Sequence, residues 1–223
     1  MSNQQTAQLF LDKLSRFQPD FAQISRALAL YSSAIALAHE RVLKSAILKA
    51  ASLGAGIDLI YETMLQSYLF LGFPRMLTAA ECFQEVFPEF TKELKVAEPT
   101  SGLFENWFNR GTELCRRVYG ENFDRLKKRI SLFSPEIYLW MALEGYGKVL
   151  SRPGLNIRDR ELAIVGALMM DNRPKQLYSH IRGALNVGVD ETTLRLVIND
   201  LEYVTPEGYE SAQVYLKQIE RNV

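Results

Sequence analysis

The sequence predicts an all-α protein. Apolar residues recur at spacings of three and four, the period of an amphipathic helix, as in Phe21, Ile24 and Leu28. No segment stands out with the alternation of apolar and polar residues that is typical of a half-buried strand. Prolines and glycines interrupt the helical pattern at intervals that suit helix ends. We therefore expect a fold built from helices and their connections.

The expected helices follow one another along the whole chain, and their boundaries have physical causes. They span residues 4–16, 20–38, 40–53, 57–71, 75–86, 103–119, 122–131, 135–150, 158–171, 174–187, 190–203 and 207–221. Helix starts are predicted from Pro19-Asp20, Ser134-Pro135 and Pro174, and helix ends from Gly54, Gly72-Phe-Pro74 and Gly188. Because Pro174 closely follows Asp171, the chain is expected to reverse there into a helical hairpin.

The stretch from Pro88 to Gly102 differs in composition from the segments around it. It mixes charged residues with two prolines and ends in a glycine, which indicates a partly helical linker. We therefore predict an N-terminal domain of residues 1–87, a linker of residues 88–102 and a C-terminal domain of residues 103–223.

An internal repeat relates the two predicted domains. When residues 26–54 are compared without gaps to residues 160–188, eight of 29 positions are identical, where chance gives roughly two. The identities include Arg26 with Arg160, and Gly54 with Gly188. The apolar pattern of the two segments also matches, so both are expected to form the same helical hairpin. We predict that the domains arose by internal duplication.

Glu161 and His180 are the main candidates for chemistry. They lie on opposite sides of the predicted hairpin turn. At about 1.5 Å per residue, Glu161 lies roughly 15 Å before the turn and His180 roughly 9 Å after it, an axial offset of about 6 Å. In an antiparallel hairpin the two side chains can therefore meet, and a carboxylate that orients an imidazole makes a general acid or base. A surface ion pair is the alternative interpretation. Ala27 and Ala46 stand at the matching positions of the first copy.

The charge balance argues against strongly electrostatic partners. The 223 residues carry 26 basic and 26 acidic side chains, so no net field favours nucleic acid or an anionic membrane. No stretch approaches the roughly 18 apolar residues of a membrane span, and the first residues lack the features of a secretory signal. We expect a cytoplasmic protein that binds a small molecule, with neither nucleic acid nor a membrane as its partner.

The few cysteines and histidines do not support a thiol or metal centre. Cys82 and Cys115 are not part of a Cys-x-x-Cys motif and are expected to be buried, unreactive thiols. His39 and His180 are far apart in sequence, and no clustered metal ligands accompany either one. We therefore predict neither a metal site nor a cofactor.

Two runs of residues around the predicted hairpin form a pattern. The first run is Arg158, Arg160, Glu161, Leu162 and Ala163, and the second is Gln176, Leu177, His180, Ala184, Leu185 and Gly188. This pattern resembles the carboxymuconolactone decarboxylase and alkylhydroperoxidase D-like superfamily. The resemblance implies a tandem of two small helical domains of this type, the first of them degenerate. It also implies a homo-oligomer with a site near the hairpin, which a neighbouring domain or subunit completes.

The resemblance separates two mechanisms. In the hydroperoxidase-like branch a glutamate, a Cys-x-x-Cys motif and a histidine form a thiol relay, but here the two cysteine positions fall on Arg173 and Gln176. Neither side chain can replace a thiolate, so thiol-relay hydroperoxidase activity is not expected. The decarboxylase branch lacks those cysteines and implies lyase chemistry with Glu161 and His180 as catalytic residues. Arg160, Arg173 and Gln176 are then the substrate-binding candidates.

Three functional hypotheses stay open at this point. The first is a cofactor-independent acid/base enzyme that acts on a small carboxylated molecule. The second is a non-catalytic oligomeric relative in which Glu161, Arg160 and His180 form a structural network. The third and least favoured is a peroxidase that uses Cys82 or Cys115.

Overall fold

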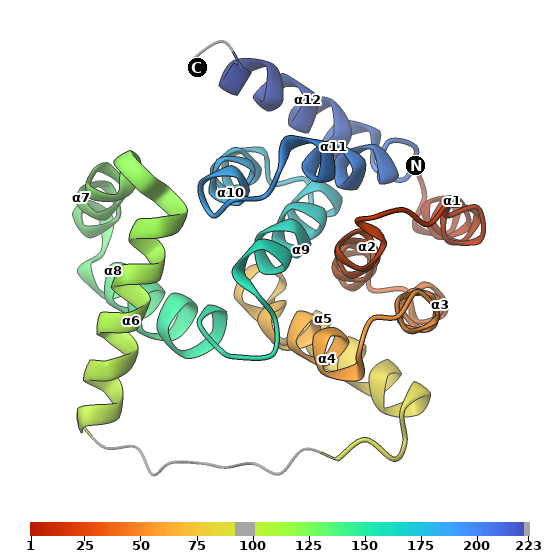
Figure 1. Cartoon of the computed structure of the whole chain (residues 1–223), viewed down its shortest axis with the longest axis horizontal. Coiled ribbons are helices and arrows are strands. Elements are labelled where there is room, and N and C mark those ends of the chain that lie inside the picture. Colours follow the sequence, from red (N-terminus) through yellow and green to blue (C-terminus); the bar gives the residue numbers. More distant parts are fainter. Residues whose placement is uncertain (92–100, 221–223) are drawn as a thin grey trace. The chain divides into compact units, whose positions relative to one another are not determined.

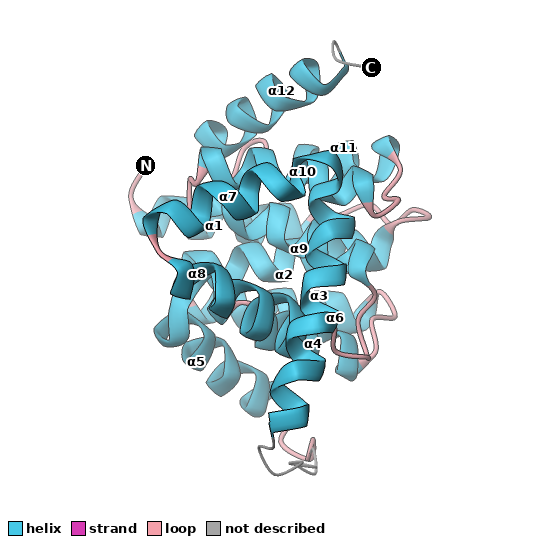
Figure 2. Ribbon diagram, turned by 90° about the vertical axis from the view of Figure 1, so that its left-hand side faces the viewer, coloured by secondary structure: helices cyan, strands magenta, loops and turns pink. Residues whose placement is uncertain are grey.

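The computed structural model describes residues 1–91 and 101–220, and every regular element within them is helical (Figure 2). The predicted all-α fold is confirmed. The α-helices are α1 (Asn3–Ser15), α2 (Gln23–Leu37), α3 (Glu40–Ser52), α4 (Ile57–Gln66), α5 (Tyr68–Val86), α6 (Ser101–Tyr119), α7 (Phe123–Phe133), α8 (Pro135–Trp140), α9 (Ile157–Met170), α10 (Pro174–Asn186), α11 (Glu191–Asp200) and α12 (Pro206–Glu220). A short 3₁₀ helix, η1 (Gly120–Asn122), and a π-helix, η2 (Met141–Leu150), complete the set.

The helices form two compact units. The larger unit combines an N-terminal part, Met1–Pro88, with a C-terminal part, Gly154–Val223, and the smaller unit is Glu89–Pro153. This division by packing differs from the predicted domains, residues 1–87 and 103–223, which rest on the sequence repeat and stay a prediction. Most of the predicted linker, residues 92–100, lies outside the described residues.

The same order of helices occurs twice in the larger unit. Helices α2, α3 and α4 begin at residues 23, 40 and 57, and α9, α10 and α11 begin 134 residues later, at 157, 174 and 191. The packing recurs as well, because α2 contacts α3, α4 and α5 whereas α9 contacts α10, α11 and α12. The structural offset equals the offset found in the sequence. Duplication as the origin of this recurrence stays a prediction.

Helices α2 and α9 pack along one another and join the two parts of the larger unit (Figure 1). Gly166 allows their close approach, because a Cβ atom at this position would lie 2.6 Å from the carbonyl oxygen of Ala29 and 2.8 Å from Oγ of Ser33. Near the start of both helices, the hydroxyl of Ser25 donates a hydrogen bond of 2.5 Å to the carboxylate of Asp159. Helices α2 and α9 therefore approach closely at Gly166 and are linked by a hydrogen bond near their starts.

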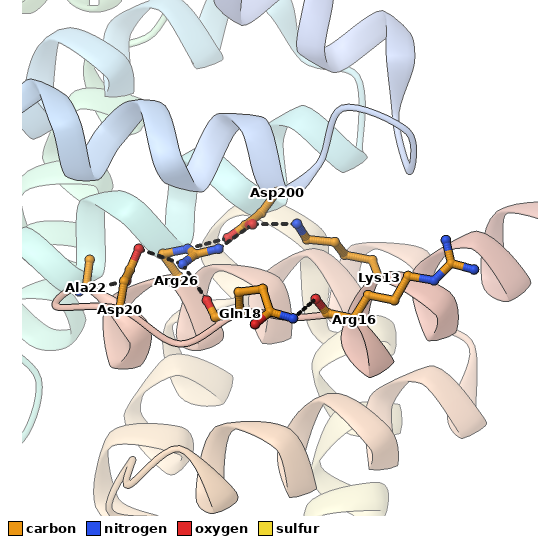
Figure 3. A network of polar contacts seen from close by, with 7 residues as sticks. All are labelled: Lys13, Arg16, Gln18, Asp20, Ala22, Arg26 and Asp200. Atoms are coloured by element: carbon orange, nitrogen blue, oxygen red, sulfur yellow. Dashed lines mark hydrogen bonds and ion pairs between the residues drawn. The ribbon is translucent and has the colours of Figure 1, made fainter.

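A buried arginine in the N-terminal part is bound by the C-terminal part (Figure 3). Nε and Nη2 of Arg26 both donate to the carboxylate of Asp200, at 2.7 Å each. Nη1 of Arg26 donates to Asp20 at 2.7 Å, and Nζ of Lys13 lies 2.6 Å from Oδ1 of Asp200. Because Asp200 is almost fully buried, this network ties α11 to α1 and α2 through charge-assisted hydrogen bonds.

Arg160 stands at the matching position of the second repeat. It lies in the C-terminal part and is bound by residues of the N-terminal part. Its Nη2 donates to Glu62 at 3.0 Å, and its Nη1 donates to Gln66 at 3.1 Å. Gln66 returns a hydrogen bond of 3.2 Å to the carbonyl oxygen of Arg160. Gln66 and Asp200 are also 134 positions apart. Each arginine therefore binds an acceptor at the corresponding position of the other part of the unit.

Some predicted helix boundaries were wrong, and the structure shows why. The predicted helix 20–38 starts late, at Gln23, because the carboxylate of Asp20 accepts from the backbone N–H of Ala22 and holds a turn before the helix. The predicted helix 57–71 ends at Gln66, where the hydroxyl of Ser67 donates to the carbonyl oxygen of Met64 and competes with the helical pattern. The predicted break near Gly72 is a kink within α5.

The smaller unit is organised around α6 and η2, which pack closely. A Cβ atom at Gly111 would lie 1.9 Å from the carbonyl oxygen of Ala142, and one at Gly147 would lie 2.0 Å from that of Trp107. The single helix predicted for residues 135–150 is divided in the structure into α8 and a π-helical segment. Within the described residues, no helix is both long and apolar enough to cross a membrane.

The substitution Asp200→Ala tests the network around Arg26. We expect it to lower the free energy of unfolding by about 3 kcal/mol, because the buried guanidinium of Arg26 loses its bidentate acceptor. Chemical denaturation at neutral pH measures the change. Glu191→Gln, which breaks the exposed pair between Glu191 and Arg195, is the control and should cost less than about 0.5 kcal/mol. Equal losses for both variants would contradict the role given to Asp200.

Candidate functional site

The hairpin of α9 and α10 carries the candidate site, and local sequence features set its geometry. The side chain of Asn156 caps the start of α9 by accepting from the backbone N–H of Asp159 at 3.0 Å. Helix α9 ends at Met170, Asp171 is its C-cap, and Asn172 adopts a left-handed conformation with φ of 50°. Pro174 then starts α10 as its first helical residue. The chain thus reverses within a few residues, as the sequence predicts.

Within this hairpin the structure brings Glu161 and His180 together. Nδ1 of His180 lies 2.9 Å from Oε2 of Glu161. Glu161 is fully buried and His180 is 5% exposed. Since an ionised carboxylate can only accept a hydrogen bond, Nδ1 is the donor, and Nε2 of a neutral ring keeps its lone pair. The arrangement fixes both the orientation of the imidazole and its tautomer.

Two further features mark the pair of Glu161 and His180: an aromatic ring beside the imidazole and a carboxylate oxygen without a hydrogen-bond donor. Phe70, on α5, meets the imidazole of His180 edge to face, with 5.2 Å between ring centroids and an interplanar angle of 88°. Oε1 of Glu161 is buried and accepts no hydrogen bond from the described residues. A buried carboxylate oxygen without a donor is costly, and Oε1 of Glu161 has room in its hydrogen bonding for one more donor.

Arg160 precedes Glu161 in sequence but belongs to a different environment. The resemblance implies a substrate-binding role for it, yet its guanidinium is fully buried. Nε donates to the carbonyl oxygen of Leu155, and the two Nη atoms donate to Glu62 and Gln66. All three nitrogens are therefore engaged by the protein. A substrate-binding role for Arg160 stays a prediction from the resemblance.

Arg173 and Gln176 are both exposed, Arg173 as the residue that precedes α10 and Gln176 in its first turn. Nε of Arg173 donates to Oδ2 of Asp171 at 2.7 Å. Nη1 of Arg75, which follows the kink of α5, donates to the other carboxylate oxygen of Asp171. Asp171 thus holds one arginine from each part of the larger unit. We refer to Arg75, Asp171 and Arg173 as the arginine cluster.

Sequence reasoning missed three residues of this region: Phe70, Arg75 and Asp171 as an ion-pair partner. Phe70 and Arg75 come from a segment about 100 residues away in sequence, and their contacts exist only in the folded chain. The run Tyr68-Leu-Phe-Leu-Gly72-Phe-Pro74 was the available signal, because a glycine and a proline so close together mark a special backbone geometry.

The residues at the matching positions of the first repeat and the two cysteines are all buried. Ala27 and Ala46, which match Glu161 and His180, are both buried, so the first repeat has no polar pair there. Cys82 and Cys115 are also buried, and burial raises the pKa of the Cys82 thiol. In residues 1–91 and 101–220, no three His, Cys, Asp or Glu side chains gather as a metal ion would require.

The pH dependence of stability tests the arginine cluster. Desolvation by burial raises the pKa of Asp171, but hydrogen bonds from Arg173 and Arg75 outweigh it and hold that pKa below its usual range. The resulting stability is fully present above the unfolded pKa of about 3.9 and is lost as the pH falls through the lower folded pKa. In thermal melts, Asp171→Asn should therefore be less stable than the wild type at neutral pH, and the gap should shrink below about pH 4. A gap that is independent of pH would contradict this assignment.

Comparison with known proteins finds relatives of the segment that contains the hairpin. Residues 135–205 match the carboxymuconolactone decarboxylase family. A 4-carboxymuconolactone decarboxylase of Acinetobacter baylyi is 28% identical to this chain over 95 residues, which cover 42% of this chain and 71% of that protein. The family match includes α9, α10 and α11, and with them Glu161 and His180. Through these residues the chain is similar to the carboxymuconolactone decarboxylase family.

Proposed function

We propose that this protein is a carboxymuconolactone decarboxylase-like lyase that performs cofactor-independent acid/base chemistry on a small carboxylated molecule. The contact between Nδ1 of His180 and Oε2 of Glu161, at 2.9 Å, carries the proposal. His180 is the general acid or base, and Glu161 orients it. The homo-oligomeric state and cytoplasmic location expected from the sequence belong to the same proposal.

The chemistry of decarboxylation matches what such a pair can do. Loss of CO₂ breaks a carbon–carbon bond and leaves the electron pair on the carbon that remains, which must then accept a proton. A cationic imidazole can deliver this proton from Nε2 while Nδ1–H stays on the carboxylate. Glu161 then stabilises the charged ring before transfer and holds the neutral ring in one tautomer afterwards. The buried setting strengthens both interactions, because no water competes for the carboxylate.

The composition of the site favours this chemistry over a thiol relay. The positions of the two family cysteines are occupied by Arg173 and Gln176, and neither Cys82 nor Cys115 is near them in sequence. Disulfide exchange needs a thiolate nucleophile, which these side chains cannot provide. The opposing hypothesis with most support is a structural role, since His180 is only 5% exposed. In that case the pair would fix the packing of α9 on α10 without turnover.

The substitution His180→Gln separates catalysis from packing. With 4-carboxymuconolactone as the substrate, we expect the wild-type protein to release CO₂. His180→Gln should lower kcat by about 100-fold or more, because glutamine cannot transfer a proton. Glu161→Gln should also lower kcat, because the amide neither fixes the tautomer nor stabilises the charged ring. Released CO₂ and thermal melting are measured on the same samples.

The other histidine provides the matched control. His39→Gln should leave kcat unchanged, because His39 lies at the start of α3, outside the family match. Absence of CO₂ release by the wild type would contradict the decarboxylase assignment. A full rate in His180→Gln would remove His180 from the mechanism. If His180→Gln instead lowers melting by several degrees and the wild type shows no turnover, the pair is structural.

A further inference from the structure

The smaller unit exposes a run of large apolar side chains where α7 ends and α8 begins. Within residues 132–140, five large apolar side chains are exposed: Leu132, Phe133, Ile137, Leu139 and Trp140. Leu132 is 77% exposed and Phe133 is 68% exposed. Single exposed apolar residues are common on protein surfaces, but a concentration of this kind indicates a contact with another molecule.

Helix α7 carries basic residues in front of this apolar end. Its eleven residues include four basic ones and a single acidic one. Arg125, Lys128 and Leu132 are all exposed and are spaced by three and four, so they lie on one face of the helix. Along this face the basic residues come first and the apolar ones follow. We refer to Arg125, Lys128, Leu132 and Phe133 as the α7 surface.

The second part of α5, in the larger unit, has the complementary pattern. After the kink, four exposed side chains recur at every fourth position: Phe73, Leu77, Glu81 and Glu85. Glu85 is paired with Lys44 at 2.5 Å, and its side chain is still 61% exposed. Here the apolar residues come first and the acidic ones follow. We refer to Phe73, Leu77, Glu81 and Glu85 as the α5 surface.

The two surfaces match when their helices run antiparallel. In that orientation the apolar end of the α7 surface meets the apolar start of the α5 surface, and the basic residues meet the acidic ones. The apolar and acidic pairs of α5 are centred eight residues apart, about 12 Å along the helix. The basic and apolar pairs of α7 are centred six residues apart, roughly 9 Å, and the long basic side chains can span the difference. A parallel orientation would place apolar residues against charges.

Neither surface matches itself. Two α7 surfaces would set basic side chains against one another or against apolar residues, and two α5 surfaces would do the same with acidic side chains. The charge of the whole chain is balanced, with 26 basic and 26 acidic side chains. The opposite charges are nevertheless concentrated on these two separate surfaces. Every copy of the chain therefore offers both halves of one complementary contact.

We propose that the α7 surface of one copy of this chain binds the α5 surface of a second copy. In a two-fold symmetric dimer this contact forms twice, since each copy supplies both surfaces. The inference rests on the homo-oligomeric state in the proposed function and names the interface that produces it. It places no residue of the second copy at His180.

Charge reversal tests the interface through the mass of the protein in solution. Sedimentation equilibrium should show the wild type associating to a dimer, and rising salt should weaken this association. Glu81→Lys and Lys128→Glu should each weaken it at least tenfold, because each variant sets like charges opposite one another. An equimolar mixture of the two variants should recover the association, since each mixed dimer contains one native and one reversed charge pair.

Matched variants separate the interface from general effects of surface mutation. Lys127→Glu makes the same charge change at the neighbouring residue, whose ammonium group lies 5.3 Å from the ring centroid of Tyr138, and should associate like the wild type. Leu77→Ser should weaken association. Leu48→Ser should not, although Leu48 on α3 is 56% exposed and Leu77 is 54% exposed. Thermal melting checks that each variant is folded.

A wild type that stays monomeric at every concentration would overturn the proposal, and so would a mixture of Glu81→Lys and Lys128→Glu that fails to associate. Equal effects of Lys127→Glu and Lys128→Glu would contradict it as well. If the monomeric wild type instead binds vesicles of anionic lipid, the α7 surface is a membrane contact and the proposal fails. These outcomes are independent of turnover. Release of CO₂ by a monomeric wild type would leave the proposed chemistry standing without this interface, whereas a dimer that releases no CO₂ would keep the interface and remove the chemistry.

Discussion

The buried guanidinium of Arg160 is the constraint on which the rest of the site depends. A buried cation is tolerated only when its donors are satisfied, and the side-chain acceptors of Arg160, Glu62 and Gln66, both lie on α4. Helix α4 is therefore held against the first turn of α9. Since Glu161 is the next residue, the same contacts set the position from which its carboxylate reaches His180. Arg26 and Asp200 repeat the arrangement in the opposite direction, so the two parts of the unit interlock.

The fold and the central pair follow from local rules, which is why the sequence predicts them well. Apolar spacing identifies the helices. The end of α9 before Asp171 and the start of α10 at Pro174 can be predicted from proline and turn chemistry alone. Once the hairpin is predicted, the rise per residue places Glu161 opposite His180 with no knowledge of the remaining chain. The structure has them 2.9 Å apart. The 134-residue offset could be read in the same way, from identities along one chain.

What sequence reasoning could not give are contacts between distant segments. Arg160 looked available to a substrate because its partner Glu62 is 98 positions away, and no local pattern announces that pairing. Phe70 and Arg75 were missed for the same reason. The packing units were also not predictable from composition, since Gly154–Val223 forms one compact unit with Met1–Pro88. In each case a tertiary contact overrides what the neighbouring residues suggest.

The candidate site draws its groups from both parts of one polypeptide: Phe70 from one, Glu161 and His180 from the other. Had these groups been divided between separate subunits, their meeting would require association, and the fraction of complete sites would fall on dilution. Covalent linkage replaces that association by an intramolecular one with a fixed effective concentration. The arrangement of these three residues is therefore independent of how much protein is present.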